Sequence, residues 1–295
     1  MGQALRSLVF RPPVPPTYTS NSHMRWLPTK GGSVIPAVYL QRKSSLIILY
    51  SHANAEDLGL VLPYARRCAD VWGVSFFCYE YTGYGLSAGG CPSEEHLYSD
   101  VEAAYHYLTE TLHYSPSNII SFGKSLGSIP ATHVASLKCD IAALVLQSGL
   151  ASIFRIKLPH IPGKYPGDMG CNIDKIGRVK CPVLILHGSE DTLCTLSHAK
   201  ALASKHAGIT VACFIEGAGH NDLDWPPFLA HVDVAVVAFL RRVSSLVDAR
   251  DACIRRLLKA YAVAEAAAIT NHRMHTRATT REGYTSRVPL NFLSS

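Results

Sequence analysis

Short apolar runs alternate with helix-like segments between residues 45 and 246 of this chain. Buried strands separated by amphipathic helices are typical of a parallel sheet with helices on both faces. The sequence therefore predicts an α/β fold with a mostly parallel, twisted sheet. The predicted strands are 24–27 and 33–40, both at a sheet edge, then 45–50, 74–79, 119–122, 141–146, 182–186 and 210–215. The predicted helices are 58–71, 94–112, 128–137, 197–206 and 226–246.

One strand-to-helix junction carries a Gly-x-Ser-x-Gly motif, GKSLG at residues 123–127. In this context the motif is typical of a nucleophile elbow, a sharp turn that lifts a serine hydroxyl to the end of a strand. The two glycines are needed because a Cβ would clash where the backbone turns so tightly. Ser125 is therefore a candidate nucleophile. Lys124 is expected to be a solvated side chain, with steering of an anionic substrate as the alternative.

A serine hydroxyl needs a base to remove its proton and an acid to orient that base. Asp191 and His220 each follow a predicted strand, and the order Ser125, Asp191, His220 is that of α/β-hydrolases. Glycines around His220 would let its side chain reach across the sheet edge, whereas His187 is expected to be buried and hydrogen-bonded.

Other carboxylates lie close to these positions in the sequence. Glu190 is a rival for the acid role, but Asp191 lies deeper in the loop. Asp222 and Asp224 are expected to cap the following helix.

An oxyanion hole needs two backbone N–H groups aimed at the developing charge. One is predicted at Leu126, directly after the nucleophile. The second is predicted at Asn54, with Ala53 as the alternative, in the loop that follows strand 45–50. A purely structural interpretation of this loop is a helix N-terminus capped by Asn54. His52 is expected to hold the loop by a hydrogen bond.

The composition limits the classes of function. With 48% hydrophobic and 17% charged residues, the 295-residue chain is expected to be globular. The net charge of +6 is spread along the chain, which does not indicate nucleic acid but suits an anionic membrane surface. Nine cysteines without C-x-x-C pairs indicate reduced, mostly buried thiols in the cytoplasm. We expect no metal and no cofactor.

The N-terminus offers a candidate lipidation site. Gly2 follows Met1, but the position where myristoylation prefers Ser or Thr holds Arg6, and Ser7 comes one residue later. No cysteine precedes Cys68, so the N-terminus has no site for palmitoylation. No apolar stretch is long enough for a transmembrane helix or a secretory signal.

Three domains are predicted. Residues 1–22 form a Pro-rich N-terminal segment, a candidate membrane anchor, of which 11–19 lie as an extended strap across the body. Residues 23–246 form the main domain, with a short cap segment after strand 141–146. Residues 153–158 of that segment mix apolar and basic side chains, and either line an acyl groove, touch a membrane or form an ordinary cap. Residues 247–295 form a helix followed by a disordered tail.

Several motifs together resemble one known family. The chain resembles the α/β-hydrolase domain-containing protein 17 family, the membrane-associated serine hydrolases that remove palmitate from cytoplasmic protein cysteines. The resemblance covers residues 10–240 and rests on FRPP and PTYT in 10–19, SHANAEDLG at 51–59, YEYTGYG at 79–85, GKSLG at 123–127, HGSED at 187–191 and EGAGHND at 216–222.

The resemblance implies the α/β-hydrolase fold and a Ser125, His220, Asp191 triad. It implies a serine hydrolase that cleaves long-chain acyl thioesters from S-acylated proteins at the cytoplasmic face of membranes. Two features depart from the family: Ala53 replaces a glycine in the oxyanion loop, and the N-terminal cysteine cluster is missing, so that Gly2 would be the substitute anchor.

Two other functions use the same residues. A carboxylesterase or lipid hydrolase would employ the same triad, because a fold does not fix its substrate. A non-catalytic binding protein on a hydrolase scaffold is the third alternative.

Overall fold

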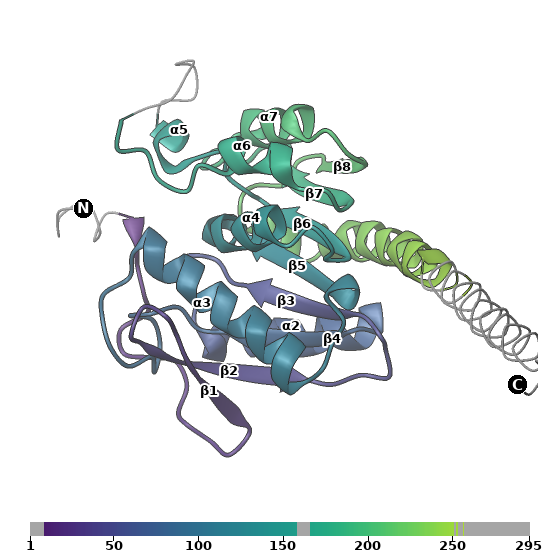
Figure 1. Cartoon of the computed structure of the whole chain (residues 1–295). Helices are drawn as coiled ribbons and strands as arrows, with labels where there is room; N and C mark the ends of the chain where they lie inside the picture. The colour runs from purple at the N-terminus through teal and green to yellow at the C-terminus, as the bar shows by residue number, and fades with distance from the viewer. Residues whose placement is uncertain (1–8, 158–165, 251, 253–255, 257–295) are drawn as a thin grey trace, which may run out of the picture. The chain divides into compact units, whose positions relative to one another are not determined.

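A single eight-stranded sheet, drawn as arrows in Figure 1, organises the chain. The computed structural model describes residues 9–157, 166–250, 252 and 256. The strand order is β1-β2-β4-β3-β5-β6-β7-β8. The strands are β1 (Met24–Pro28), β2 (Val34–Leu40), β3 (Ile47–Ser51), β4 (Ser75–Tyr79), β5 (Ile119–Lys124), β6 (Ala143–Gln147), β7 (Val183–Gly188) and β8 (Thr210–Ile215).

Strands β1 and β2 join the sheet edge antiparallel, and all the pairings from β4 to β8 are parallel. The predicted mostly parallel sheet and its α/β-hydrolase architecture are thereby confirmed. Each predicted strand is present, with ends that differ by a few residues.

Helices follow the strands in the predicted alternation. They are α2 (Leu58–Trp72), α3 (Glu94–His106), α4 (Ser128–Leu137), α5 (Ile153–Lys157), α6 (Asn172–Lys175) and α7 (Leu196–Lys205). Shorter turns are η1 (Tyr107–Thr111), η2 (Pro116–Asn118), η3 (Ser125–Gly127), η4 (Ile176–Arg178) and η5 (Asp222–Asp224). The predicted helix 94–112 ends as an α-helix at His106 and continues as the π-helical turn η1.

The last helix starts later than predicted, at residue 229, because residues 226–228 form a turn that includes the Pro226-Pro227 pair. The chain divides into two compact units, Met1–Ser244 and Ser245–Ser295. In the second unit residues 245–250 are helical. Most of the predicted tail lies outside the described residues, as do Gly2, Arg6 and Ser7.

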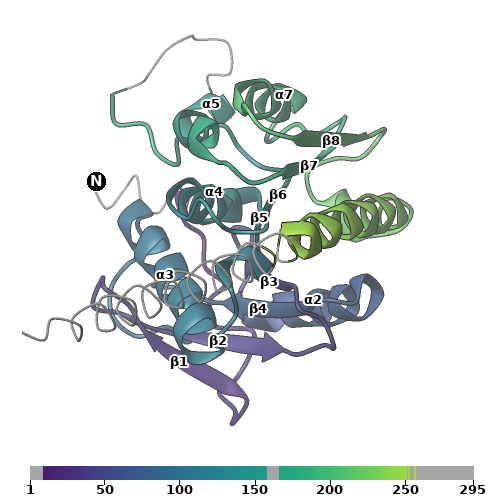
Figure 2. The same ribbon diagram turned by 45° about the vertical axis from the view of Figure 1, so that its right-hand side comes forward.

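Helices cover both faces of the sheet, as Figure 2 shows from a second angle. Neighbouring residues of a strand point to opposite faces. Phe76 of β4 packs against Trp72 of α2, whereas the adjacent Phe77 stacks on Tyr107 after α3. Helices α2 and α3 therefore lie on opposite faces, which buries every residue of β3, β4 and β5.

Segment 11–19 is bonded to the loops that follow β3 and β4. The Thr17 N–H donates to Asp57 at 2.7 Å, and the Tyr18 hydroxyl donates to Glu80 at 2.9 Å. Phe10, just before the segment, is 4% exposed and belongs to the core. We call residues 9–19 the strap.

The cysteines are less uniformly buried than expected. Of the eight that the structure describes, all are free thiols, and only four are buried: Cys68, Cys78, Cys181 and Cys194.

Candidate active site

Ser125 lies at a strained turn between β5 and α4. Its φ of +49° lies in the left-handed region, which is unfavourable for a residue with a Cβ. A Cβ on Gly123 would come within 2.3 Å of the Gly127 carbonyl oxygen. A Cβ on Gly127 would come within 2.0 Å of the Ser51 carbonyl oxygen. Both contacts are with backbone, so the glycines permit the tight turn that the motif predicted.

The structure brings together the three predicted residues. The Ser125 Oγ lies 2.8 Å from Nε2 of His220, and the His220 Nδ1 lies 2.7 Å from Oδ2 of Asp191. Both distances are those of hydrogen bonds. The arrangement allows His220 to take a proton from Ser125 while Asp191 fixes the orientation of the imidazole ring.

Asp191 is buried in a nest of donors. Its Oδ1 accepts the N–H groups of Leu193 and Cys194 at 2.9 and 2.8 Å. Burial opposes ionisation of this carboxyl, but the hydrogen bonds from His187 and His220 outweigh it and hold the pKa of Asp191 well below its usual value. Asp191 is therefore a fixed negative charge beside His220. The buried, hydrogen-bonded His187 is as predicted, since its Nε2 lies 2.6 Å from the Cys194 carbonyl oxygen.

The competing carboxylates point elsewhere. Glu190 is exposed, whereas Asp191 is 3% exposed. Asp222 accepts the Gly219 N–H at 2.7 Å, and Asp224 pairs with Lys124. The prediction that Asp222 and Asp224 cap the next helix is wrong, because both carboxylates are engaged in holding the loop around His220.

The loop of His220, which follows β8, is bonded to the residue just after β6, two strands away in the sheet. The Ser148 Oγ, just after β6, donates to the His220 carbonyl oxygen at 3.0 Å. Gly217 takes a φ of +73° in the turn that follows β8. The loop after β8 thereby positions the His220 side chain next to Ser125, which follows β5.

The loop after β3 reaches the same edge of the sheet, because Ser51 pairs with Gly123 across β3 and β5. Among the residues that the structure describes, no acceptor is assigned to the N–H of Leu126 or of Asn54. The Ala53 N–H, by contrast, donates to Oε2 of Glu56 at 2.9 Å. Of the two candidates in this loop, Ala53 is thus the one whose N–H is already engaged, and Asn54 stays the predicted donor.

The strap holds the side chain of Asn54. Its Nδ2 donates to the Val9 carbonyl oxygen at 2.6 Å, and its Oδ1 accepts the Arg11 N–H at 2.9 Å and the Tyr84 hydroxyl at 2.7 Å. The suggestion that Asn54 caps the following helix is wrong. Asp57 caps α2, accepting the N–H groups of the second and third helical residues at 3.1 and 3.3 Å.

His52 has the structural role predicted for it. Its Nε2 bonds to Oε1 of Glu80 at 2.9 Å, and both side chains are buried. Burial opposes protonation of the ring, but the hydrogen bond and charge of Glu80 outweigh it and raise the pKa of His52. The pair stabilises the base of the loop.

Lys124 is not a solvated side chain, and that prediction is wrong. Its side chain is 7% exposed, and Nζ lies 2.6 Å from Oε1 of Glu56 and pairs also with Asp224. The missed residues are sequence neighbours of the predicted site: Glu56 follows Asn54 by two positions, and Asp224 follows His220 by four. One basic residue at the carboxyl end of a parallel strand and two acidic residues in the loops beyond other strands were the signal that could have predicted this cluster.

A cavity of about 660 Å³ lies beside these loops. Its size falls within the range typical of small-molecule sites. Lys124, Glu56, Asp224 and Asn221 line it together with apolar side chains, including Leu60, Tyr64 and Trp225.

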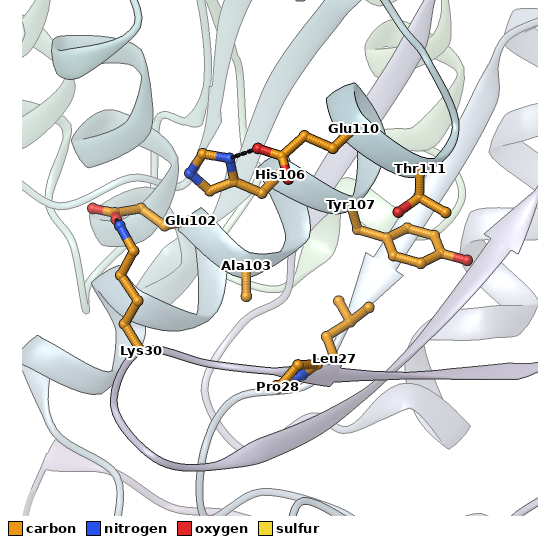
Figure 3. A pocket seen from close by; sticks show the side chains of 9 residues that line it. All are labelled: Leu27, Pro28, Lys30, Glu102, Ala103, His106, Tyr107, Glu110 and Thr111. Atoms are coloured by element: carbon orange, nitrogen blue, oxygen red, sulfur yellow. Dashed lines mark hydrogen bonds and ion pairs between the residues drawn. The ribbon is translucent and has the colours of Figure 1, made fainter.

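A second, smaller cavity, of about 240 Å³, involves α3, η1 and the β1–β2 hairpin (Figure 3). Neither cavity is lined by the predicted site residues, which are Ser125, Asp191, His220, Leu126 and Asn54.

The cap segment is only partly described. Ile153 and Ile156 of α5 pack against the core, and Arg155 pairs with Asp168 at 3.5 Å. Residue 158 of the predicted 153–158 segment lies outside the described residues. Within the described ranges, no group of three or more His, Cys, Asp or Glu side chains is arranged to bind a metal. The described helices include none with the length and hydropathy needed to span a membrane.

Comparison with solved structures places the fold. Esterase Pf2001 of Pyrococcus furiosus superposes with a TM-score of 0.65 at 14% identity, over 79% of this chain and 97% of that one. Mouse alpha/beta hydrolase domain-containing protein 10 superposes with a TM-score of 0.59 at 15% identity, over 75% and 99% of the two chains. At these identities the likeness concerns the fold alone.

Sequence relatives are more informative. No family model matches the chain. Alpha/beta hydrolase domain-containing protein 17C of Xenopus tropicalis is 38% identical over 202 residues, which are 68% of this chain and 64% of that protein. Human protein 17C is 38% identical over 61% of this chain and 54% of its own length. Human protein 17B is also 38% identical, over 60% of this chain and 61% of its own length. The chain thus spans less than two thirds of the length of these relatives. Over this shared part, the chain belongs to the alpha/beta hydrolase domain-containing protein 17 family.

Proposed function

We propose that this chain is a serine hydrolase that cleaves long-chain acyl thioesters from S-palmitoylated proteins. One observation carries the proposal: Ser125 Oγ, His220 and Asp191 form a continuous hydrogen-bonded relay at 2.8 and 2.7 Å. The strained φ of Ser125 supports it, because such strain is typical of functional sites.

In the proposed reaction, Ser125 Oγ attacks the thioester carbonyl carbon while its proton moves to Nε2 of His220. The N–H groups of Leu126 and Asn54 donate to the oxyanion that forms. The carbon–sulfur bond then breaks, and His220 gives its proton to the departing cysteine sulfur. A water molecule then attacks the acyl-Ser125 ester while His220 takes its proton. The bond between the acyl carbon and Ser125 Oγ breaks, the fatty acid leaves, and His220 returns the proton to Oγ. Asp191 stays ionised throughout and stabilises the imidazolium.

The cavity beside the site supports a substrate with a large apolar part. Leu60 and Trp225 on its wall are 51% and 68% exposed, so their apolar surfaces are accessible to an acyl chain. A net charge of +6 favours approach to anionic membrane surfaces, where acylated proteins reside. We propose a cytoplasmic protein that binds membranes peripherally, with Gly2 as the anchor.

The test is hydrolysis of a palmitoyl-thioester peptide by the wild-type protein and by Ser125→Ala. The variant should lose activity by about 10⁴-fold or more, since a triad works as a unit. Ser136→Ala is the matched control, because the Ser136 Oγ donates only to the His133 carbonyl oxygen in α4. Equal rates for wild type and Ser125→Ala would exclude the proposal.

A panel of oxygen esters and thioesters of varied chain length separates this function from the carboxylesterase alternative. A preference for short oxygen esters would favour the latter. Absence of Ser125 labelling by a fluorophosphonate probe would favour a non-catalytic binding protein.

A further inference from the structure

A lysine is buried between the loops of the candidate active site. We infer that Lys124 is a positioning residue, whose ammonium group holds the loops of Ser125, Asn54 and His220 in the geometry that the reaction needs. This inference rests on the proposed function and deepens it.

Lys124 joins two loops directly. It is the last residue of β5, so its backbone leads straight into the turn at Ser125. Its Nζ contacts Glu56, in the loop of Asn54, and Asp224, in the loop of His220. The exposed fractions of the three side chains are 7%, 23% and 10%, so water competes little for these contacts.

Each carboxylate uses its second oxygen to fix a further group. The Glu56 Oε2 accepts the N–H of Ala53, and the Asp224 Oδ1 accepts the side-chain amide of Gln147 at 2.6 Å. The result is a continuous chain of contacts from the loop after β3, through the end of β5, to the end of β6. Because the Ala53 amide is held by Glu56, the direction of the next amide, that of Asn54, depends on the same chain.

Stability alone does not account for this cluster. Removing a lysine and two carboxylates from water costs several kcal/mol per ion, and apolar side chains of similar volume often stabilise as well or better. Burial disfavours the charged lysine, but Glu56 and Asp224 outweigh it and raise the pKa of Lys124, so the ammonium persists. The cost of burying this cluster is explained by the geometry that it imposes on the turn at Ser125 and on the two loops that it joins.

The experiment compares Lys124→Met with Lys124→Arg in the full-length protein, measuring kcat and KM for a palmitoyl-thioester peptide and the thermal midpoint. Lys175→Met is the matched control: its lysine side chain is 15% exposed and pairs with Glu94, and neither residue contacts the site loops. Misplacement of reacting groups by 1 Å can cost about 100-fold in rate. We expect Lys124→Met to lower kcat by about that factor with KM within about twofold, and Lys124→Arg to recover most of the loss.

Three results would overturn the inference. These are an unchanged kcat in Lys124→Met, a change confined to KM, which would mean that Lys124 binds substrate, and an equal loss of kcat in Lys175→Met. If Lys124→Met does not fold, Asp224→Asn replaces it, since this variant keeps the Lys124–Glu56 pair. It should also lower kcat with little effect on KM.

Wild-type activity separates the two proposals. An active wild-type enzyme with an unaffected Lys124→Met variant contradicts only the role of Lys124. A wild-type protein that neither hydrolyses acyl esters nor reacts with a fluorophosphonate at Ser125 contradicts both.

Discussion

Replacement of Asp57 by alanine tests whether the strap is fastened to the hydrolase body through one buried carboxylate. Asp57 is fully buried and accepts two N–H groups of the first turn of α2. It also accepts the backbone N–H and the hydroxyl of Thr17 in the strap. A Cβ on Gly59 would lie 2.8 Å from the Thr17 carbonyl oxygen, so the strap rests directly on the start of α2.

The expected loss follows from these contacts. An N-cap contributes about 1 kcal/mol. Each strap hydrogen bond to the charged carboxylate contributes about 1.5 kcal/mol, a low value because Thr17 is exposed and water can replace it. Asp57→Ala should therefore lower the free energy of unfolding by about 4 kcal/mol, a large part of the 5–15 kcal/mol typical of a domain.

Urea denaturation at pH 7 measures this free energy. Ser93→Ala is the control, because Ser93 caps α3 through one hydrogen bond, to the His96 N–H, and binds no strap. It should cost only about 1 kcal/mol. Thr17→Val removes one strap bond and should couple to Asp57→Ala by about 1 kcal/mol in a double-mutant cycle. Equal losses in Asp57→Ala and Ser93→Ala, or no coupling to Thr17, would refute the reasoning.

Three further predictions concern the site and the core. Gly127→Ala places a Cβ within 2.0 Å of a backbone oxygen, so we expect loss of fluorophosphonate labelling and a lower thermal midpoint. Labelling and a thermal midpoint equal to those of the wild type would contradict the tight turn. Asp191→Asn should lower kcat by about 10⁴-fold, since the amide no longer holds His220 in the required tautomer. Glu190→Gln should leave kcat unchanged. A similar loss of kcat in both variants would contradict the assignment of Asp191 as the only acid of the triad. Burial raises the pKa of Asp100 to about 7. The folded state then binds a proton more tightly than the unfolded state, and stability falls as pH rises from about 4 to 7, by at most about 4 kcal/mol. Asp100→Asn should flatten the thermal midpoint between pH 5 and 7, and an identical slope would exclude this group as the cause.

The sequence alone determined the order of strands and helices and the three residues of the relay. Each buried strand is a short apolar run bounded by polar residues, and this pattern is local. Ser125, Asp191 and His220 could be found because each lies in the loop or turn after such a strand, and the carboxyl ends of parallel strands meet at one edge of the sheet. The glycines at 123 and 127 predicted the tight turn, since a Cβ at either position would clash with nearby backbone atoms.

Only the tertiary structure decided which side chains support the relay. Lys124 alone in sequence is a charged residue in a glycine-rich turn, and such side chains are usually solvated. It is buried because β5 lies in the interior of the sheet, and the loops of Glu56 and Asp224 meet its side chain at the end of the strand. In the same way, Asp57 rather than Asn54 caps α2, since the strap, more than 40 residues earlier, occupies the Asn54 side chain. These partners are distant in sequence, and only folding of the chain brings their charges and amides within hydrogen-bond distance.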